Sequence, residues 1–75
     1  MKPEKQNDAR LLRMKQVQEL TGLSRSSIYG MSSAGNFPSS LQLVPGGTSV
    51  AWVAKEIEDW VNQRIEARDE EVSHD

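Results

Sequence analysis

The sequence contains no cysteine and a single histidine, His74, among its 75 residues. Without cysteine, disulfide bonds, thiol catalysis and cysteine-based zinc sites are excluded. One histidine beside the last residue also excludes a histidine-rich metal site and a Ser-His-Asp triad. The longest apolar run, residues 50–54, is about a quarter of the ~20 residues that a membrane span needs. These absences predict a protein that is not an enzyme and holds no cofactor.

The chain is also too short for a second core, so one small domain is expected. Its first eight residues are polar and lack the apolar stretch of a secretory signal, which predicts a cytoplasmic location. We expect residues 1–9 to form a flexible lead-in, residues 10–68 to fold, and residues 69–75 to form a disordered acidic tail.

The net charge of −2 conceals an asymmetry along the chain. Residues 1–34 carry a formal charge of +3, residues 35–53 carry no charged side chain, and residues 54–75 carry −5. A polyanion would be attracted only to the N-terminal part of such a molecule. Small proteins without a polyanion partner can also have lopsided charge, so this pattern alone leaves both interpretations open.

A short helix is predicted from Met14, because Val17 and Leu20 lie on one of its faces and polar residues lie on the others. Gly22 ends this helix, since glycine adopts the left-handed conformation without steric cost. The four residues before this helix, 10–13, fit either a brief edge strand or the approach to the helix.

A second helix follows after a tight turn. Ser24 is a typical N-cap, and Leu23 and Ile28 then occupy the two positions of a hydrophobic staple. The helix runs to about Ala34, and Gly35 supplies the next stop.

Beyond this point the hydrophobic period changes from 3.6 to 2. Leu41 and Leu43 alternate with polar residues, and Val50 and Trp52 follow the same period of two after a loop. Proline followed by glycine at residues 45–46 fits a type II turn. A small β-hairpin is therefore predicted.

The last helix is marked by an apolar stripe and ends near Arg68. The stripe consists of Val53, Ile57, Trp60, Val61 and Ile65. The predicted core combines this stripe with the earlier elements and consists of Leu20, Leu23, Ile28, Leu43, Val50, Trp52, Ile57, Trp60 and Val61.

The order of helix, turn, helix, hairpin and helix is typical of a small winged helix-turn-helix. Several segments follow one another in this order, at residues 10–17, 21–29, 36–38, 50–52, 56–57, 60–61 and 64–65. Together these segments resemble the AlpA family of prophage transcriptional regulators, over the chain from Arg10 to about Arg68. The resemblance implies a mainly α fold with a small β-hairpin, a winged helix-turn-helix related to MerR-type DNA-binding domains and to phage excisionases. Such proteins act at prophage or genomic-island promoters and attachment regions, where they control integrase expression and excision.

The same resemblance implies that the helix from Ser24 to about Ala34 is a recognition helix in the major groove, and that the hairpin over residues 41–52 is a wing. Arg25, Ser26 and Tyr29 are expected near the bases, and Ser24 and Ser27 near a phosphate. The full set of expected DNA-binding residues is Arg10, Arg13, Lys15, Ser24, Arg25, Ser26, Ser27, Tyr29 and Thr48.

The sequence departs from the family pattern where basic residues are usual. Neutral residues stand at these positions: Gly30, residues 32–34 before the glycine, residues 39–40 and Thr48. Several phosphate-binding charges are therefore missing. Tyr29 has two alternatives, to pack its ring across the hairpin or to meet a base.

Two functions of different classes remain. The first is a DNA-binding regulator whose partner is double-stranded DNA, with RNA polymerase or a phage integrase as protein partners. It would act as a monomer or a weak cooperative assembly. The second is a protein-interaction module on a winged-helix scaffold with weak or lost DNA binding, which uses its acidic C-terminal helix to bind a basic partner. The missing charges favour the second function, and the family pattern and the capped second helix favour the first.

Overall fold

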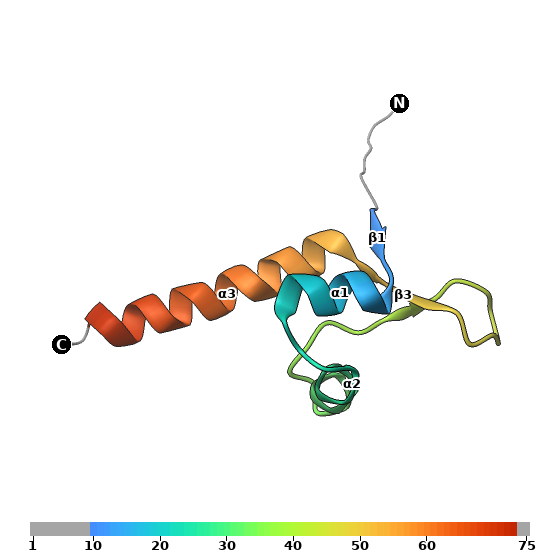
Figure 1. The fold of residues 1–75 in the computed structure, drawn as a ribbon, viewed down its shortest axis with the longest axis horizontal. Coiled ribbons are helices and arrows are strands. Elements are labelled where there is room, and N and C mark those ends of the chain that lie inside the picture. The colour runs from blue at the N-terminus through green and yellow to red at the C-terminus, as the bar shows by residue number, and fades with distance from the viewer. Residues whose placement is uncertain (1–9, 74–75) are drawn as a thin grey trace.

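The computed structural model describes residues 10–73, and within them it has three helices and a small three-stranded antiparallel sheet. The helices are α1 (Met14–Thr21), α2 (Arg25–Ser33) and α3 (Ala54–Ser73). The strands β1 (Leu11–Leu12), β2 (Leu41–Gln42) and β3 (Val50–Val53) lie in the order β1-β3-β2. Figure 1 shows the hairpin loop and the end of α3 extending from opposite sides of the domain. The expected mainly α fold with a hairpin is confirmed at this level.

The residues before α1 form an edge strand, which decides the alternative that the sequence left open. Strand β1 pairs with β3, with Leu12 opposite Trp52. The pairing continues where the Arg10 carbonyl accepts a hydrogen bond from the Ala54 N–H at 2.8 Å. The strand therefore ties the start of the described chain to the start of α3.

The turn between α1 and α2 forms as predicted. Gly22 has φ of +74°, and its N–H donates to the Gln18 carbonyl at 2.7 Å. Ser24 caps α2, since its Oγ accepts a hydrogen bond from the Ser27 N–H at 3.1 Å. At the other end of α2, Gly35 has φ of +81° and supplies the expected stop.

The hairpin and its turn also match the prediction. Gln42 of β2 lies opposite Val50 of β3. The Gly47 N–H donates to the Val44 carbonyl at 2.8 Å, and Gly46 has φ of +79°, as position i+2 of a type II turn requires.

The core is built around β3, the central strand of the sheet. Its buried residues are Leu12, Val17, Ile28, Phe37, Ala51, Trp52, Ala54 and Ile57. Of the predicted core, Ile28, Trp52 and Ile57 are buried, and Leu23, Val50 and Trp60 pack against the same cluster. Successive side chains of a strand point to opposite faces, and α1 and α3 both pack against β3, so Ala51 and Trp52 are both buried.

Three residues of the predicted core lie elsewhere. Leu20 is 55% exposed, because the short α1 directs Val17 into the core and Leu20 past its edge. Leu43, which follows β2, is 39% exposed, and Leu41 in β2 is 37% exposed. The two leucines therefore share one face of the hairpin, but that face is left uncovered. Val61 is only half-buried.

Helix α3 differs from the prediction at both ends. Val53 belongs to β3, so α3 begins at Ala54. The helix also continues through residues 69–73, where a disordered tail was expected. Once the packed first half has formed, each further residue adds one hydrogen bond at low cost, so helix-forming residues extend it. The predictions for residues 1–9 and 74–75 lie outside the described residues.

Candidate nucleic-acid interface

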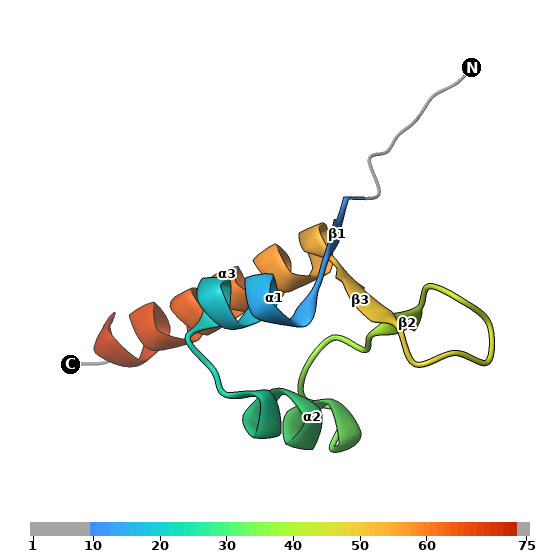
Figure 2. The same ribbon diagram turned by 45° about the vertical axis from the view of Figure 1, so that its right-hand side comes forward.

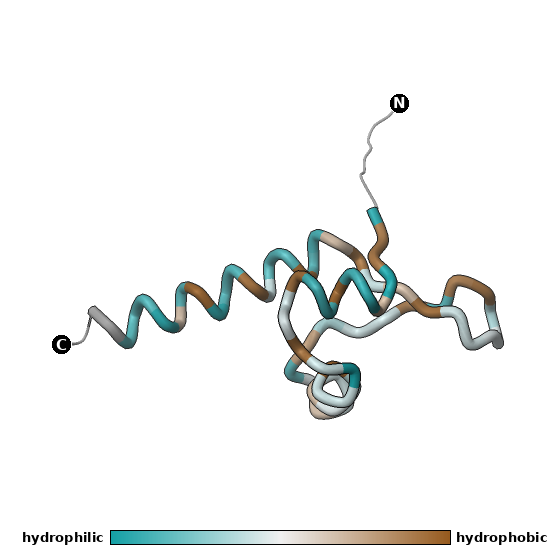
Figure 3. The backbone as a smooth tube through the Cα atoms, in the orientation of Figure 1, coloured by the Kyte–Doolittle hydropathy of each residue, from teal (hydrophilic) through white to brown (hydrophobic). Residues whose placement is uncertain are grey.

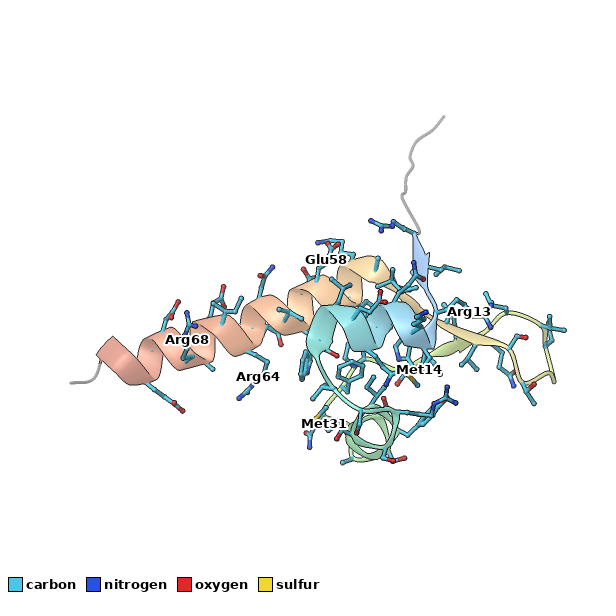
Figure 4. All side chains as sticks on the ribbon, viewed as in Figure 1. Arg13, Met14, Met31, Glu58, Arg64 and Arg68 are labelled. Carbon is cyan, nitrogen blue, oxygen red and sulfur yellow. The ribbon has the colours of Figure 1, made fainter. Side chains whose placement is uncertain are left out.

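A shallow polar hollow lies where the beginnings of α1 and α2 meet the hairpin. It has a volume of about 280 Å³ and is lined by Arg13, Met14, Lys15, Arg25, Tyr29, Thr48 and Val50. Figure 4 shows Arg13 and Met14 at the hairpin end of α1. Five of the nine residues that the sequence singled out for DNA binding therefore come together from three separate elements.

The hollow is electropositive for two reasons. Arg13, Lys15 and Arg25 are exposed, and none of them forms an ion pair with another residue in the range 10–73. Helices α1 and α2 both begin at residues that line the hollow, Met14 and Arg25, and the start of a helix carries partial positive charge. Glu19 is the only acidic residue between positions 10 and 53. An anion is the ligand that this surface would attract.

Hydrogen bonds at the starts of α1 and α2 fix the backbone of the two arginines in the hollow. Arg13 precedes α1, and its N–H donates to the Gln16 Oε1 at 2.9 Å. Arg25 is the first residue of α2, directly after the Ser24 cap. Both arginines therefore extend from rigid helix starts, a suitable arrangement for planar groups that bind phosphate or a guanine edge in pairs of hydrogen bonds.

Tyr29 joins the hollow to the core. Its ring centroid lies 6.5 Å from that of Trp52 at an interplanar angle of 47°, and the side chain is still 44% exposed. One part of the ring thus packs across the hairpin while the rest faces solvent. The Tyr29 ring can therefore pack across the hairpin and meet a base at the same time.

The serines at the start of α2 are divided between two tasks. The Ser24 hydroxyl accepts from the Ser27 N–H and donates to the Ser27 Oγ at 3.0 Å, so it is engaged within the helix. Ser26 and Ser27 are exposed in the same turn. Because Ser24 and Ser27 are bonded to each other, Ser26 is the best placed of the three to contact a ligand.

Arg10 lies apart from the other cations. It lines a different hollow, together with Ala54, Lys55 and Glu58 at the start of α3. The structure therefore does not bring Arg10 into the basic group. The chain geometry explains this separation, because β1 runs away from α1 to pair with β3.

The sequence analysis missed the apolar floor of the hollow, which is provided by Met14 and Val50. Both are half-buried and pack against the core. The strand period marked Val50 as a core residue and Met14 was only the start of the first helix; the packing of α1 beside the hairpin brings the two into one hollow.

The hairpin loop contributes little charge to the hollow. Thr48 is exposed on it, and residues 43–49 include no charged side chain. In Figure 3 the loop is drawn mainly white and brown, in contrast to the teal that dominates α3.

Over residues 10–73, no group of three or more His, Asp or Glu side chains is arranged to hold a metal ion. None of the helices in the same range is long and apolar enough to cross a membrane.

Comparison with known proteins gives two matches. The family described as prophage CP4-57 regulatory protein (AlpA) matches residues 10–65. An uncharacterized protein, ORF88 of Enterobacteria phage P4, is 44% identical over 59 residues, which is 79% of this chain. The match spans 65% of the phage protein's own length.

Proposed function

The chain belongs to the AlpA family of phage regulatory proteins, and from this premise we propose that it is a sequence-specific DNA-binding regulator of prophage or genomic-island genes. Its targets would include promoters or attachment regions that control integrase expression and excision. The observation that carries the proposal is the hollow in which Arg13, Lys15 and Arg25 stand together without acidic partners among the described residues.

The proposed mode of binding is that of a winged helix-turn-helix related to MerR-type domains. Helix α2 enters the major groove by its first turn, with Arg25 reading a guanine edge or holding a phosphate. Arg13 and Lys15 hold the backbone on one side of α2, and the β2–β3 hairpin follows the backbone as a wing. The hollow supports this mode because α2, the start of α1 and the hairpin all border it.

The electrostatic contribution of one chain would be modest. Three phosphate contacts correspond to a slope of about −2.7 in a plot of log affinity against log salt concentration. Cooperative binding to repeated half-sites, or a protein partner such as RNA polymerase or an integrase, would then supply the remaining affinity.

Selection from a pool of random-sequence duplexes, followed by fluorescence anisotropy at two salt concentrations, tests this proposal. We expect one enriched sequence class and a salt slope of about −2 to −3 for the full chain. The double variant Arg13→Ala/Arg25→Ala should lose most of the binding. The matched control Arg64→Ala/Arg68→Ala removes two arginines from α3, outside the hollow, and should retain it.

The alternative function gives the opposite result in the same assay. A protein-interaction module that has lost DNA affinity would enrich no sequence, and the two double variants would behave alike. Either finding would exclude the DNA-binding proposal.

A further inference from the structure

A hollow at the C-terminal end of α1 is apolar, but its charges select no particular partner. It has a volume of about 270 Å³ and is lined by Leu20, Ile57, Glu58, Val61 and Asn62. Leu20 is 55% exposed at its edge. Helical spacing places Arg64 and Arg68 on the same face of α3 as Val61. Acidic and basic side chains therefore both border this surface.

A larger hollow lies on a different face of α3. It has a volume of about 660 Å³, with α3 on one side and the segment from the end of α2 to β2 on the other. Figure 2 shows this segment rising from α2 to β2, beside β3. Apolar side chains come from both sides of the hollow, and they are Phe37, Pro38, Leu41, Val53 and Trp60.

The apolar lining of this hollow is only partly covered. The Phe37 and Trp60 rings pack edge to face, with their centroids 4.8 Å apart. The Trp60 Nε1–H donates to the Asn36 carbonyl, so its polar group is satisfied within the fold while part of the side chain stays accessible. Leu41 is 37% exposed, and Leu43 beyond it is also exposed. Apolar side chains that gather in a hollow and stay in solvent are typical of a contact site.

The charge along this side of α3 has one sign. Glu56 and Asp59 line the hollow, and Gln63 follows them on the same helical face. Glu66 and Glu70 continue that face, each seven residues after Asp59 and Gln63 respectively. Figures 1 and 2 show that no other element covers the C-terminal half of α3. An acidic strip therefore leads along the helix to the hollow.

Little of this charge is neutralised by neighbouring side chains. No lysine or arginine lines the hollow. The Lys55 Nζ lies 3.4 Å from the Asp59 Oδ1, but both side chains are exposed, so this pair is weak. Glu56 forms no ion pair with another residue in the range 10–73. A cation that enters the hollow would therefore meet carboxylates beside an aromatic ring.

This combination selects the occupant. Arginine has a planar cation that both stacks on an aromatic ring and pairs with a carboxylate. Glu56 precedes Trp60 by one helical turn, so one guanidinium is within reach of both. A second copy presenting the same face would bring its own carboxylates, and like charges at close range oppose association. We propose that this surface, which we term the α3–β2 hollow, binds a segment of a partner protein that carries arginine beside a large apolar side chain.

The proposed contact leaves the surface for DNA free. The partner's apolar side chain would cover Leu41, and its arginine would lie against Trp60. No residue of the α3–β2 hollow lines the hollow that holds Arg13, Lys15 and Arg25, which we term the basic hollow. One chain could therefore hold DNA and the partner at the same time, and the inference does not rest on DNA binding.

The test uses synthetic peptides and the full chain. The probe is a capped peptide of about nine residues, roughly 30 Å long when extended, with a central leucine between arginines and serine and glycine at its ends. One matched peptide carries glutamate in place of arginine, and another carries serine in place of leucine. Titration into the isotope-labelled chain, followed by NMR, should give a saturable shift of the Trp60 indole N–H signal with the first peptide. The glutamate peptide should not bind, and the serine peptide should bind several-fold more weakly.

A pair of double variants tests the charge. Glu56→Gln/Asp59→Asn should weaken binding of the arginine peptide about tenfold at low salt, because two carboxylates are lost from the hollow. The matched control Glu58→Gln/Asp69→Asn removes the same charge from another face of α3. Each double variant also breaks one existing ion pair, that of Asp59 or that of Asp69. The control should stay within about twofold of the parent, since more distant charges are screened.

A pair of single variants tests the apolar contact. Leu41 and Leu11 are 37% and 38% exposed, in the two edge strands on opposite sides of β3. Leu41→Ser should weaken the arginine peptide about fivefold, since it removes an apolar contact. Leu11→Ser should leave the affinity unchanged. Thermal melting of both variants shows that a loss of binding is not a loss of fold.

Four results would overturn the proposal. Equal binding of the arginine and glutamate peptides would indicate unspecific apolar attraction. Equal weakening by the two double variants would mean that only the net charge of α3 attracts the peptide. The absence of a saturable Trp60 shift in the folded parent chain would mean that the hollow is not the site. A dimer of the free chain in sedimentation equilibrium that Leu41→Ser dissociates would mean that a second copy covers the hollow.

Discussion

The two hollows at the two ends of α1 differ in almost every property that decides what binds there. The first takes Lys15 from the beginning of the helix, contains three cations and has polar side chains around a small apolar floor. The second takes Leu20 from the end of the same helix, contains apolar side chains and is bordered by Glu58. One helix of eight residues therefore serves two surfaces of opposite chemistry.

The two hollows show that the charge asymmetry along the sequence is also a charge asymmetry of the folded surface. The uncharged segment between residues 35 and 53 forms the hairpin, which lies beside the basic hollow. The acidic α3 leaves the domain in the other direction (Figure 1). Most of the acidic side chains are thus kept away from the surface that would meet a polyanion, which lessens their repulsion.

The largest expected effect is on the core that holds both surfaces in place. Trp52 is 1% exposed at the centre of β3, and it also supports Tyr29. Trp52→Ala should cost about 3–5 kcal/mol, close to the whole stability of so small a domain. Chemical denaturation followed by circular dichroism should show an unfolded or barely folded chain, with both surfaces lost.

Trp60 is the matched comparison for this prediction. It is only half-buried, with its ring 4.8 Å from that of Phe37 and its Nε1–H donating to the Asn36 carbonyl at 2.9 Å. Trp60→Ala should therefore destabilise less than Trp52→Ala. A greater loss for Trp60→Ala would mean that the core is centred on α3 instead of β3.

Local signals in the sequence were sufficient for much of this fold. Turn and cap residues act on the backbone next to them, so the sequence around them is enough to predict their roles. This applies to Gly22, Ser24 and the Pro-Gly turn. Leu20 and Ile65 could not be assigned in this way. Their helical spacing is genuine, but whether another element covers that face depends on the direction in which α1 and α3 pack.

The second prediction concerns the basic hollow alone. Arg25→Ala should weaken DNA binding by about 1–3 kcal/mol if the side chain reads a base, and relax preference at one position. If Arg25 meets only phosphate, the loss should be the same for all sequences and the salt slope should fall by about one. Binding curves at two salt concentrations separate these results. Arg64→Ala, on α3, is the control, and an equal effect of the two variants would contradict the proposed interface.

The candidate interface was predictable in its residues but not in its shape. Arg13, Lys15, Arg25, Tyr29 and Thr48 were named from helix starts, the family pattern and the hairpin, and the fold brings them together. The position of Arg10 was not predictable, because it depends on the pairing of β1 with β3. From the sequence, residues 10–13 could form either an edge strand or the approach to the first helix.

A smaller effect is expected from adding charge to the hairpin. Thr48→Arg places a fourth cation at the rim of the basic hollow, and should tighten DNA binding by about 1 kcal/mol at low salt and steepen the salt slope by about one. Gln63→Arg adds the same charge on α3, beside Trp60 and outside the basic hollow, and is the control. If both variants tighten binding equally, only the net charge matters and the hairpin does not act as a wing.

The smallest expected effect is that of Arg10→Ala, and it tests the boundary between the two regions. Arg10 and Arg13 are both exposed and only three residues apart, so a purely sequence-based view gives both the same weight. The structure places Arg10 with Lys55 and Glu58 instead, where the neighbouring carboxylate offsets its field. Arg10→Ala should therefore change DNA affinity by less than about twofold at moderate salt, while Arg13→Ala lowers it several-fold and reduces the salt slope by about one. Equal losses for the two variants, measured by anisotropy on the same duplex, would mean that the bound DNA extends past β1 to the start of α3. The acidic helix would then face DNA directly, and the separation of the two surfaces would not hold.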